Sequence, residues 1–148
     1  MKILINTQYF WPETFRINDV VIFLEERGYS VDILTGKPNY PDGSLFKEYR
    51  DNPSKFETYS KSRIYRIPIF LRGKSTSISL FFNYCSYVMS AIFFGTFILR
   101  NKKYDVIITF ATSPITVAIP GIYFSWIKNT KHILWVLDLW PDILKELN

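Results

Sequence analysis

Cysteine and histidine are almost absent from this 148-residue chain, which holds one of each, Cys85 and His132. A single cysteine excludes an internal disulfide, and so few soft or imidazole ligands argue against a metal site. Cys85 lies in an apolar run, which predicts a buried structural thiol. A secretory signal peptide is not expected either, because residues 1–5 favour a first strand and hence a cytoplasmic start.

Glycine is missing from residues 8–18, the segment between the first expected strand and the first expected helix. Nucleotide-binding α/β domains usually carry a glycine-rich phosphate loop there, so a dinucleotide fingerprint is excluded. The helix N-terminus with Arg16 beside it is a weaker anion site. Glu13, Arg16 and Asn18 are therefore candidate substrate contacts. The alternative is that Glu13 and Arg16 are surface charges and that Trp11 packs.

What the chain does contain is a high share of apolar and aromatic residues together with a mild basic excess. Hydrophobic residues make up 48% and aromatic residues 18% of the chain, and the formal net charge is +5. Such an excess favours phosphate-bearing substrates, an anionic membrane surface or nucleic acid as partners.

Short apolar runs alternate with segments of helical spacing along the whole chain. Strands are predicted at residues 3–5, 31–34, 64–67, 104–109 and 132–137, and helices at 17–24, 78–99 and 113–128. Ser113 is expected as the N-cap and Pro114 as the first position of the last helix, with a kink at Pro120. Residues 37–62 look irregular. This order predicts one α/β domain with a Rossmann-like, doubly wound, mostly parallel sheet.

The predicted helix at residues 78–99 carries no charge and, at about 33 Å, is long enough to span a bilayer. Ser79, Asn83, Ser86 and Ser90 form one polar stripe along it. Three interpretations stay open: a helix packed in the domain with its outer face on a membrane, an ordinary buried helix, and a true span. A span would place the strands before and after it on opposite sides of a membrane.

Polar and aromatic residues follow the strands at their carboxyl ends, where open α/β sheets bind ligands. Asn39 and Tyr40 could hydrogen-bond and stack on a sugar, and the Thr112 and Ser113 hydroxyls could meet a polar ligand. Asp138 follows the last strand, and a carboxylate there can accept a proton from an attacking hydroxyl. Each of these candidates has a structural alternative. Asn39 and Tyr40 would form a simple turn, Ser113 would cap a helix, and Asp138 would accept hydrogen bonds within its own turn. His132, at the other end of its strand, is interpreted as structural.

Five segments together resemble the N-terminal domain of GT-B fold glycosyltransferases of family 4, especially bacterial enzymes of O-antigen, capsule and exopolysaccharide synthesis, including fucosamine-type transferases. They are residues 8–13 (QYFWPE), 26–36 (ERGYSVDILTG), 38–43 (PNYPDG), 113–117 (SPITV) and 135–142 (WVLDLWPD). Their order and spacing extend over nearly the whole chain. The chain departs from the family pattern in lacking glycine in the first loop and in carrying Leu137 where relatives often have a polar residue.

The resemblance implies an acceptor-side half of a hexosyltransferase that moves a hexose or amino sugar from a nucleotide sugar to a lipid-linked saccharide. It implies no metal and no cofactor beyond the donor substrate, and a peripheral place at the inner face of the cell membrane. The other half, a C-terminal GT-B domain or a partner chain, would hold the donor, so residues 1–148 alone are expected to be inactive. Nucleic acid is not an expected partner. The alternative function is a non-catalytic membrane-associated module that scaffolds polysaccharide enzymes.

Overall fold

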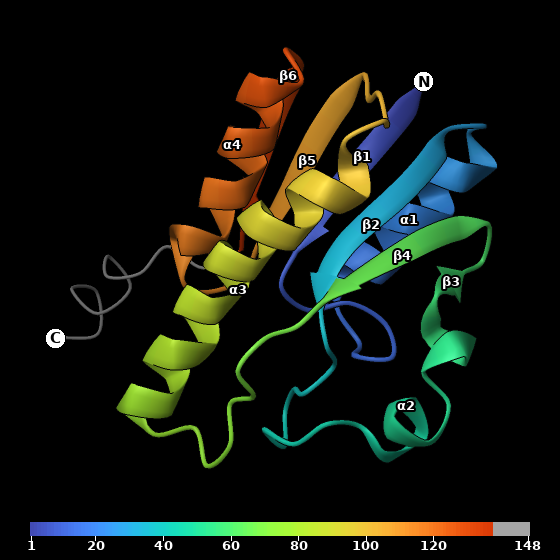
Figure 1. Ribbon diagram of the computed structural model, residues 1–148. Coiled ribbons are helices and arrows are strands. Elements are labelled where there is room, and N and C mark those ends of the chain that lie inside the picture. Colours follow the sequence, from blue (N-terminus) through green and yellow to red (C-terminus); the bar gives the residue numbers. More distant parts are fainter. Residues whose placement is uncertain (138–148) are drawn as a thin grey trace, which may run out of the picture.

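A computed structural model describes residues 1–137 and shows an α/β domain around one six-stranded sheet (Figure 1). The strands lie in the order β3-β4-β2-β1-β5-β6, and every neighbouring pair is parallel except β3 with β4. The predicted Rossmann-like, mostly parallel sheet is thereby confirmed. The strands are β1 (Lys2–Thr7), β2 (Ser30–Gly36), β3 (Thr58–Tyr59), β4 (Ser62–Ile67), β5 (Val106–Ala111) and β6 (Lys131–Val136).

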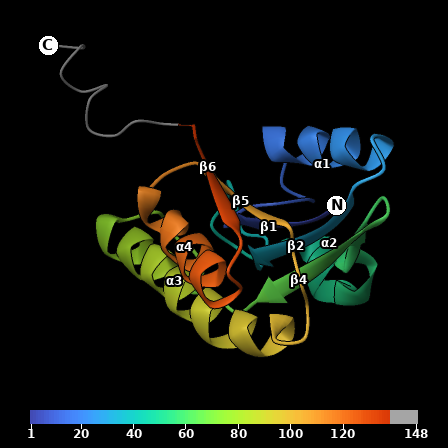
Figure 2. The same ribbon diagram turned by 90° about the horizontal axis from the view of Figure 1, so that it is seen from above.

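The helices cover both faces of the sheet, with α1 (Arg16–Glu26) on one face and α3 (Ser77–Leu99) and α4 (Ala118–Ile127) on the other (Figure 2). The chain moves from β1 outward in one direction to β2 and β4, and then returns to place β5 and β6 on the other side of β1. The connections that follow β1 and β5 therefore run in opposite directions along the sheet. In such sheets a crevice forms at this switch point, outside the carboxyl ends of the strands.

Two stretches depart from the sequence interpretation. Residues 37–62 are not wholly irregular, because they form α2 (Lys47–Asp51), a 3₁₀ turn η1 (Pro53–Phe56) and the short strand β3. The last helix does not begin at Pro114, whose ψ of 166° is extended, but passes through a 3₁₀ turn, η2 (Ile115–Val117), into α4. Ser113 therefore caps no helix. Pro120 lies in the first turn of α4, where its missing N–H has no intrahelical partner to lose, so the reason for a kink disappears.

The long apolar helix packs on the sheet through a mixed face that includes one residue of the predicted polar stripe, Asn83, while Ser79, Ser86 and Ser90 are half-buried. Asn83, Tyr87, Ala91, Gly95 and Leu99 recur at intervals of four, and all five are buried. They form one face of the helix, as this spacing requires. The outward face carries exposed apolar side chains instead: Ile78, Phe81, Phe82, Met89, Phe93, Phe94 and Phe97. Residues 1–137 thus leave a wide apolar face of α3 uncovered.

This arrangement narrows the three interpretations of the segment. Within residues 1–137, α3 is the one helix whose length and composition would suit a bilayer, but only 28% of its apolar window is buried. The interpretation of residues 78–99 as an ordinary buried helix is therefore wrong. A true span is disfavoured because α3 packs directly against β2, β4 and α4 of the same domain. Contact of its outer face with a membrane stays a prediction.

Close approach of α3 to α4 and β2 depends on Gly95. A Cβ atom at this position would lie 2.7 Å from Cζ of Phe124 and 3.1 Å from Cδ2 of Leu34, both fully buried. No leucine fits there without moving the core.

We expect Gly95→Leu to lower the free energy of unfolding by about 1–3 kcal/mol, because overpacking outweighs the gain in helix propensity. Urea denaturation followed by circular dichroism measures the change. Phe97→Leu, two residues away on the exposed face, is the control and should stay within about 0.5 kcal/mol of the parent. Equal stability of the Gly95→Leu variant and the parent would contradict the packing described here.

Candidate functional site

A polar cleft lies at the carboxyl ends of the strands, at the switch point between β1 and β5. Its volume is about 330 Å³, within the lower range of small-molecule sites. The loop after β1 contributes to it, as do the loops after β2, β4, β5 and β6 and helix α3. The described residues that line it are Tyr9, Phe15, Tyr40, Arg72, Tyr84, Thr112, Ser113 and Leu137.

Three aromatic rings form one wall of the cleft. Tyr9 stacks on Phe15 with ring centroids 5.6 Å apart, and the tilted ring of Tyr40 lies 5.5 Å from Tyr9 and 5.2 Å from Phe15. Tyr40 is 38% exposed, whereas Tyr9 is buried. Burial raises the pKa of Tyr9 well above its usual value, so its hydroxyl stays protonated. The wall therefore offers an apolar ring surface, and the Tyr9 hydroxyl is held by a hydrogen bond to Oδ1 of Asn83 at 3.2 Å.

Arg72 is the one charged side chain among the described residues of the cleft wall. Its guanidinium carbon lies 5.0 Å from the ring centroid of Tyr40 and 5.8 Å from that of Tyr9, within cation–π range. Its backbone N–H donates to Oδ1 of Asn39 at 3.2 Å. The Nε atom is buried and has no hydrogen-bond partner within residues 1–137. Arg72 is thus held in place through its backbone while part of its guanidinium keeps a free donor.

Glu13 lies beneath the cleft as a support for two loops. Its Oε1 accepts the backbone N–H groups of Asn39 and Tyr40, both at 2.8 Å, and its Oε2 accepts that of Phe10 at 3.0 Å. Burial raises the pKa of Glu13 to about 7, against the opposing effect of these donors and of the Arg66 charge. The carboxylate is therefore occupied by the protein's own amides, and it positions Tyr40 rather than facing a ligand.

Arg66 completes this support from β4. Its guanidinium donates to the carbonyl oxygen of Gly36 at 2.8 Å and also to that of Trp11. Burial lowers the pKa of Arg66 to about 10, with the Glu13 charge acting in the opposite direction, so the group stays cationic at neutral pH. The loop after β1 is therefore joined to the end of β2 and to the loop after it by the buried Glu13 and the partly buried Arg66.

The candidate residues chosen from the sequence fall into two groups. Tyr40, Thr112 and Ser113 meet in the cleft. Glu13, Asn18 and Asn39 are buried and engaged in the protein: Nδ2 of Asn18 donates to the Glu13 carbonyl oxygen, and Asn39 bonds Lys37 and Arg72. These three are supports of the site and not its surface, because a buried polar group must find its partners inside the fold.

Arg16 and Asp138 stand apart from both groups. Arg16 is exposed at the start of α1 and does not line the cleft. Asp138, the candidate catalytic residue, lies outside the described residues. His132, which was interpreted as structural, forms a hydrogen bond through Nε2 to Oγ1 of Thr109 at 2.9 Å. Burial lowers the pKa of His132. Residues 1–137 hold no group of three metal-ligating side chains.

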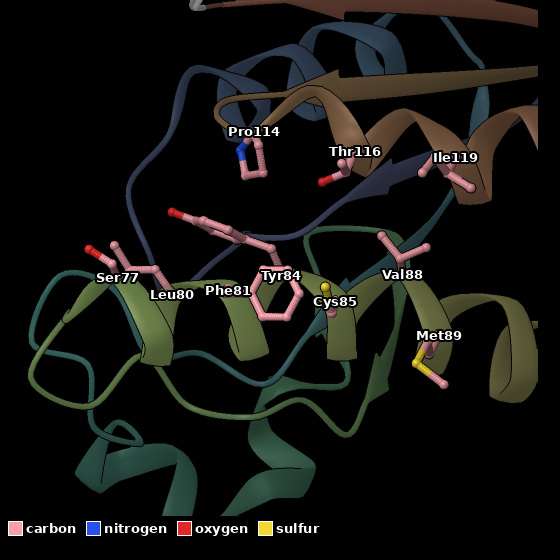
Figure 3. A pocket seen from close by; sticks show the side chains of 10 residues that line it. All are labelled: Ser77, Leu80, Phe81, Tyr84, Cys85, Val88, Met89, Pro114, Thr116 and Ile119. Atoms are coloured by element: carbon pink, nitrogen blue, oxygen red, sulfur yellow. The ribbon is translucent and has the colours of Figure 1, made fainter.

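A second, apolar hollow adjoins the cleft between α3 and the η2–α4 segment (Figure 3). We call it the α3–α4 groove. Its volume is about 640 Å³, and its walls are almost entirely apolar; they are formed by Ser77, Leu80, Phe81, Tyr84, Cys85, Val88, Met89, Pro114, Thr116 and Ile119. Cys85 was expected to be buried, but it is half-buried and lines this groove, because α3 packs on the sheet through Asn83 and Tyr87 instead.

Arg72 and the two tyrosines Tyr9 and Tyr84 were not selected from the sequence. In the sequence Arg72 is one of several cationic residues between positions 55 and 74, and only its position after β4, at a strand's carboxyl end, could have distinguished it. Tyr84 lay within an apolar helix and carried no signal of its own. Its role depends on which side of α3 meets η2, and that is decided by tertiary packing.

The raised pKa of Glu13 predicts a pH-dependent stability. Its folded-state pKa of about 7 lies above the ordinary value of 4.5, so the folded protein keeps a proton that the unfolded chain releases. Stability should therefore fall as pH rises from about 4.5 to about 7, by up to about 3 kcal/mol at 1.4 kcal/mol per pH unit. Glu13→Gln should flatten this slope, since no group then titrates.

Urea denaturation at several pH values between 5 and 8 measures the slope. Glu26→Gln, on the exposed side of α1, serves as the matched control and should keep the slope of the parent. If parent and Glu13→Gln protein lose stability equally over this range, Glu13 is not the titrating group.

No family model matches the chain, and no curated protein matches it. Among solved structures, the fold is similar to the crystal structure of the C-terminal domain of a hydrogenase from Pyrococcus furiosus, with a TM-score of 0.57 and 90% of each chain covered. The two sequences are 11% identical. At this identity the similarity shows a shared α/β fold alone.

Proposed function

We propose that this chain is the acceptor-side half of a glycosyltransferase that transfers a hexosyl or amino-sugar unit from a nucleotide sugar to a lipid-linked saccharide. The observation that carries the proposal is the continuity of two unlike surfaces: a polar, aromatic cleft at the switch point of the sheet and an apolar groove beside it. A saccharide joined to a lipid has the same two chemical parts.

The cleft suits the saccharide. Aromatic faces such as those of Tyr40 and Phe15 pack against the C–H side of a sugar ring, while the hydroxyl groups of Thr112 and Ser113 supply directional hydrogen bonds. Hydroxyls both donate and accept, which matches the hydroxyl groups of a sugar.

The outer face of α3 suits a membrane surface. Its exposed phenylalanines are flanked by Lys74 before the helix and by Arg100, Lys102 and Lys103 after it. Amphiphilic helices with such a wide apolar face and basic flanks bind at the interface of anionic bilayers. This supports a peripheral enzyme that meets its acceptor at the cytoplasmic face of the membrane.

Transfer needs a donor held opposite the acceptor, and the described cleft forms one wall only. Rate enhancement comes from fixing both reactants and stabilising the departing nucleotide phosphate. A second α/β domain, in the same polypeptide or in a partner chain, would supply that wall.

We expect no sugar transfer from the 148-residue chain alone and measurable transfer once a donor-binding α/β domain is present. The assay uses a radiolabelled nucleotide hexose or N-acetylhexosamine series and a detergent-solubilised prenyl-diphosphate sugar. Transfer by the chain alone would contradict the expectation. No transfer in either form, with every donor tested, would favour the alternative of a non-catalytic scaffold.

We further expect the chain to float with vesicles containing anionic phosphatidylglycerol. The double change Phe93→Glu and Phe97→Glu should reduce the bound fraction at least fivefold, because two carboxylates would enter the interface with anionic lipid. Phe23→Glu is the matched control, since Phe23 is a similarly exposed phenylalanine on α1, across the sheet. Equal loss of vesicle binding in the double variant and in Phe23→Glu would indicate that the membrane contact lies elsewhere.

A further inference from the structure

The polar cleft and the α3–α4 groove meet at two points. Tyr84 lines both of them, and Ser113 lines the cleft while the next residue, Pro114, lines the groove. Figure 3 shows Tyr84 on α3 facing the segment that begins at Pro114. The two hollows are therefore neighbours that share the side chain of Tyr84, and a ligand that occupies both would run past this ring.

The groove itself matches a chain of hydrocarbon. Leu80 and Val88 of α3 and Ile119 of α4 contribute side chains to opposite walls, and almost no polar surface interrupts them. A volume of about 640 Å³ lies in the middle of the range for ligand sites. Burying apolar surface there is favourable by roughly 25 cal/mol per Å², so an apolar chain would gain from entering it.

The cleft end of this path carries a cation with a free donor. Arg72 is the charged side chain of the described cleft wall, and its Nε is buried without a partner. A guanidinium binds phosphate oxygens through two parallel N–H groups, so this charge at the cleft wall suits a phosphate. The rings of Tyr9 and Tyr40 beside it hold the guanidinium plane.

We propose that the α3–α4 groove and Arg72 form one site for a single apolar chain that ends in a phosphate or diphosphate, with the chain in the groove and the phosphate at Arg72. This inference deepens the proposed function, on which it rests, by assigning the lipid and the phosphate of the acceptor to separate residues. An amphipathic helix would also fill an apolar groove, but the cation at one end would then have no counterpart.

The single cysteine of the chain gives a direct readout, because Cys85 lines the groove and its sulfur is drawn toward the groove in Figure 3. The experiment follows alkylation of Cys85 by a maleimide in the full chain. The probes are farnesyl diphosphate below its critical micelle concentration, farnesol, and inorganic diphosphate.

We expect farnesyl diphosphate to slow alkylation at least tenfold at saturation and inorganic diphosphate to leave it unchanged. Farnesol should protect as well, but at a concentration at least tenfold higher, because it lacks the phosphate that Arg72 binds. Arg72→Gln should raise the concentration of farnesyl diphosphate needed for half protection at least fivefold and leave that of farnesol unchanged.

Two exposed positions of α3 separate the groove from the general apolar surface. Met89 is 71% exposed and lines the groove, whereas Phe97 is 61% exposed and does not. Met89→Glu should abolish protection, and Phe97→Glu should retain it. Since both side chains are largely in solvent, neither change should unfold the protein, which circular dichroism verifies.

Unchanged alkylation with farnesyl diphosphate would overturn the inference, and so would equal loss of protection in the Met89→Glu and Phe97→Glu proteins, which would indicate nonspecific adhesion. Failure of the transferase proposal looks different. In that case protection follows the pattern above while no donor yields sugar transfer. Conversely, if Met89→Glu leaves sugar transfer by the two-domain enzyme unaffected, the groove assignment is overturned while the transferase proposal stands.

Discussion

The packing of α3 through the buried polar groups of Asn83 and Tyr87 is the constraint on which the remaining surface of this protein depends. Oδ1 of Asn83 accepts from Nε2 of Gln8 at 2.7 Å and from the Tyr9 hydroxyl at 3.2 Å, and the Tyr87 hydroxyl donates to Oδ1 of Asn6 at 2.9 Å. These groups are buried, so leaving any of them unpaired would cost about 1–3 kcal/mol. The helix is thereby fixed in rotation, and its apolar side has no other direction than outward.

Three features of the candidate site follow from that rotation. Tyr84 is brought to the border of the cleft, Cys85 is turned into the groove, and the phenylalanines form an uncovered face. The same hydrogen bonds reach the loop after β1, where Tyr9 belongs to the aromatic wall. The cleft and the apolar surface are therefore parts of one packing arrangement, which explains why a polar cleft and an apolar groove adjoin.

Buried charge holds the other side of the cleft. Glu13 binds the backbone of the loop after β2, and Arg66 binds carbonyl groups of the loops after β1 and β2. A loop without glycine cannot bring its backbone close to a phosphate as a phosphate loop does. Instead, this loop is shaped by side chains, and the cation that faces the cleft comes from Arg72, after β4.

Periodicity in the sequence by itself determined five of the six strands, the three long helices and the α/β class, because strand and helix periods depend on local pattern and burial. It also located Tyr40, Thr112 and Ser113 at strand ends, where the parallel sheet brings them together. Tertiary structure alone decided that Glu13 and Asn39 are supports, that Arg72 faces the cleft, and that Asn83 is the buried residue of the polar stripe on α3. These placements depend on which partner a side chain meets across the fold. Gln8 and Asn83, for example, are 75 residues apart in the sequence, so no local pattern encodes their hydrogen bond.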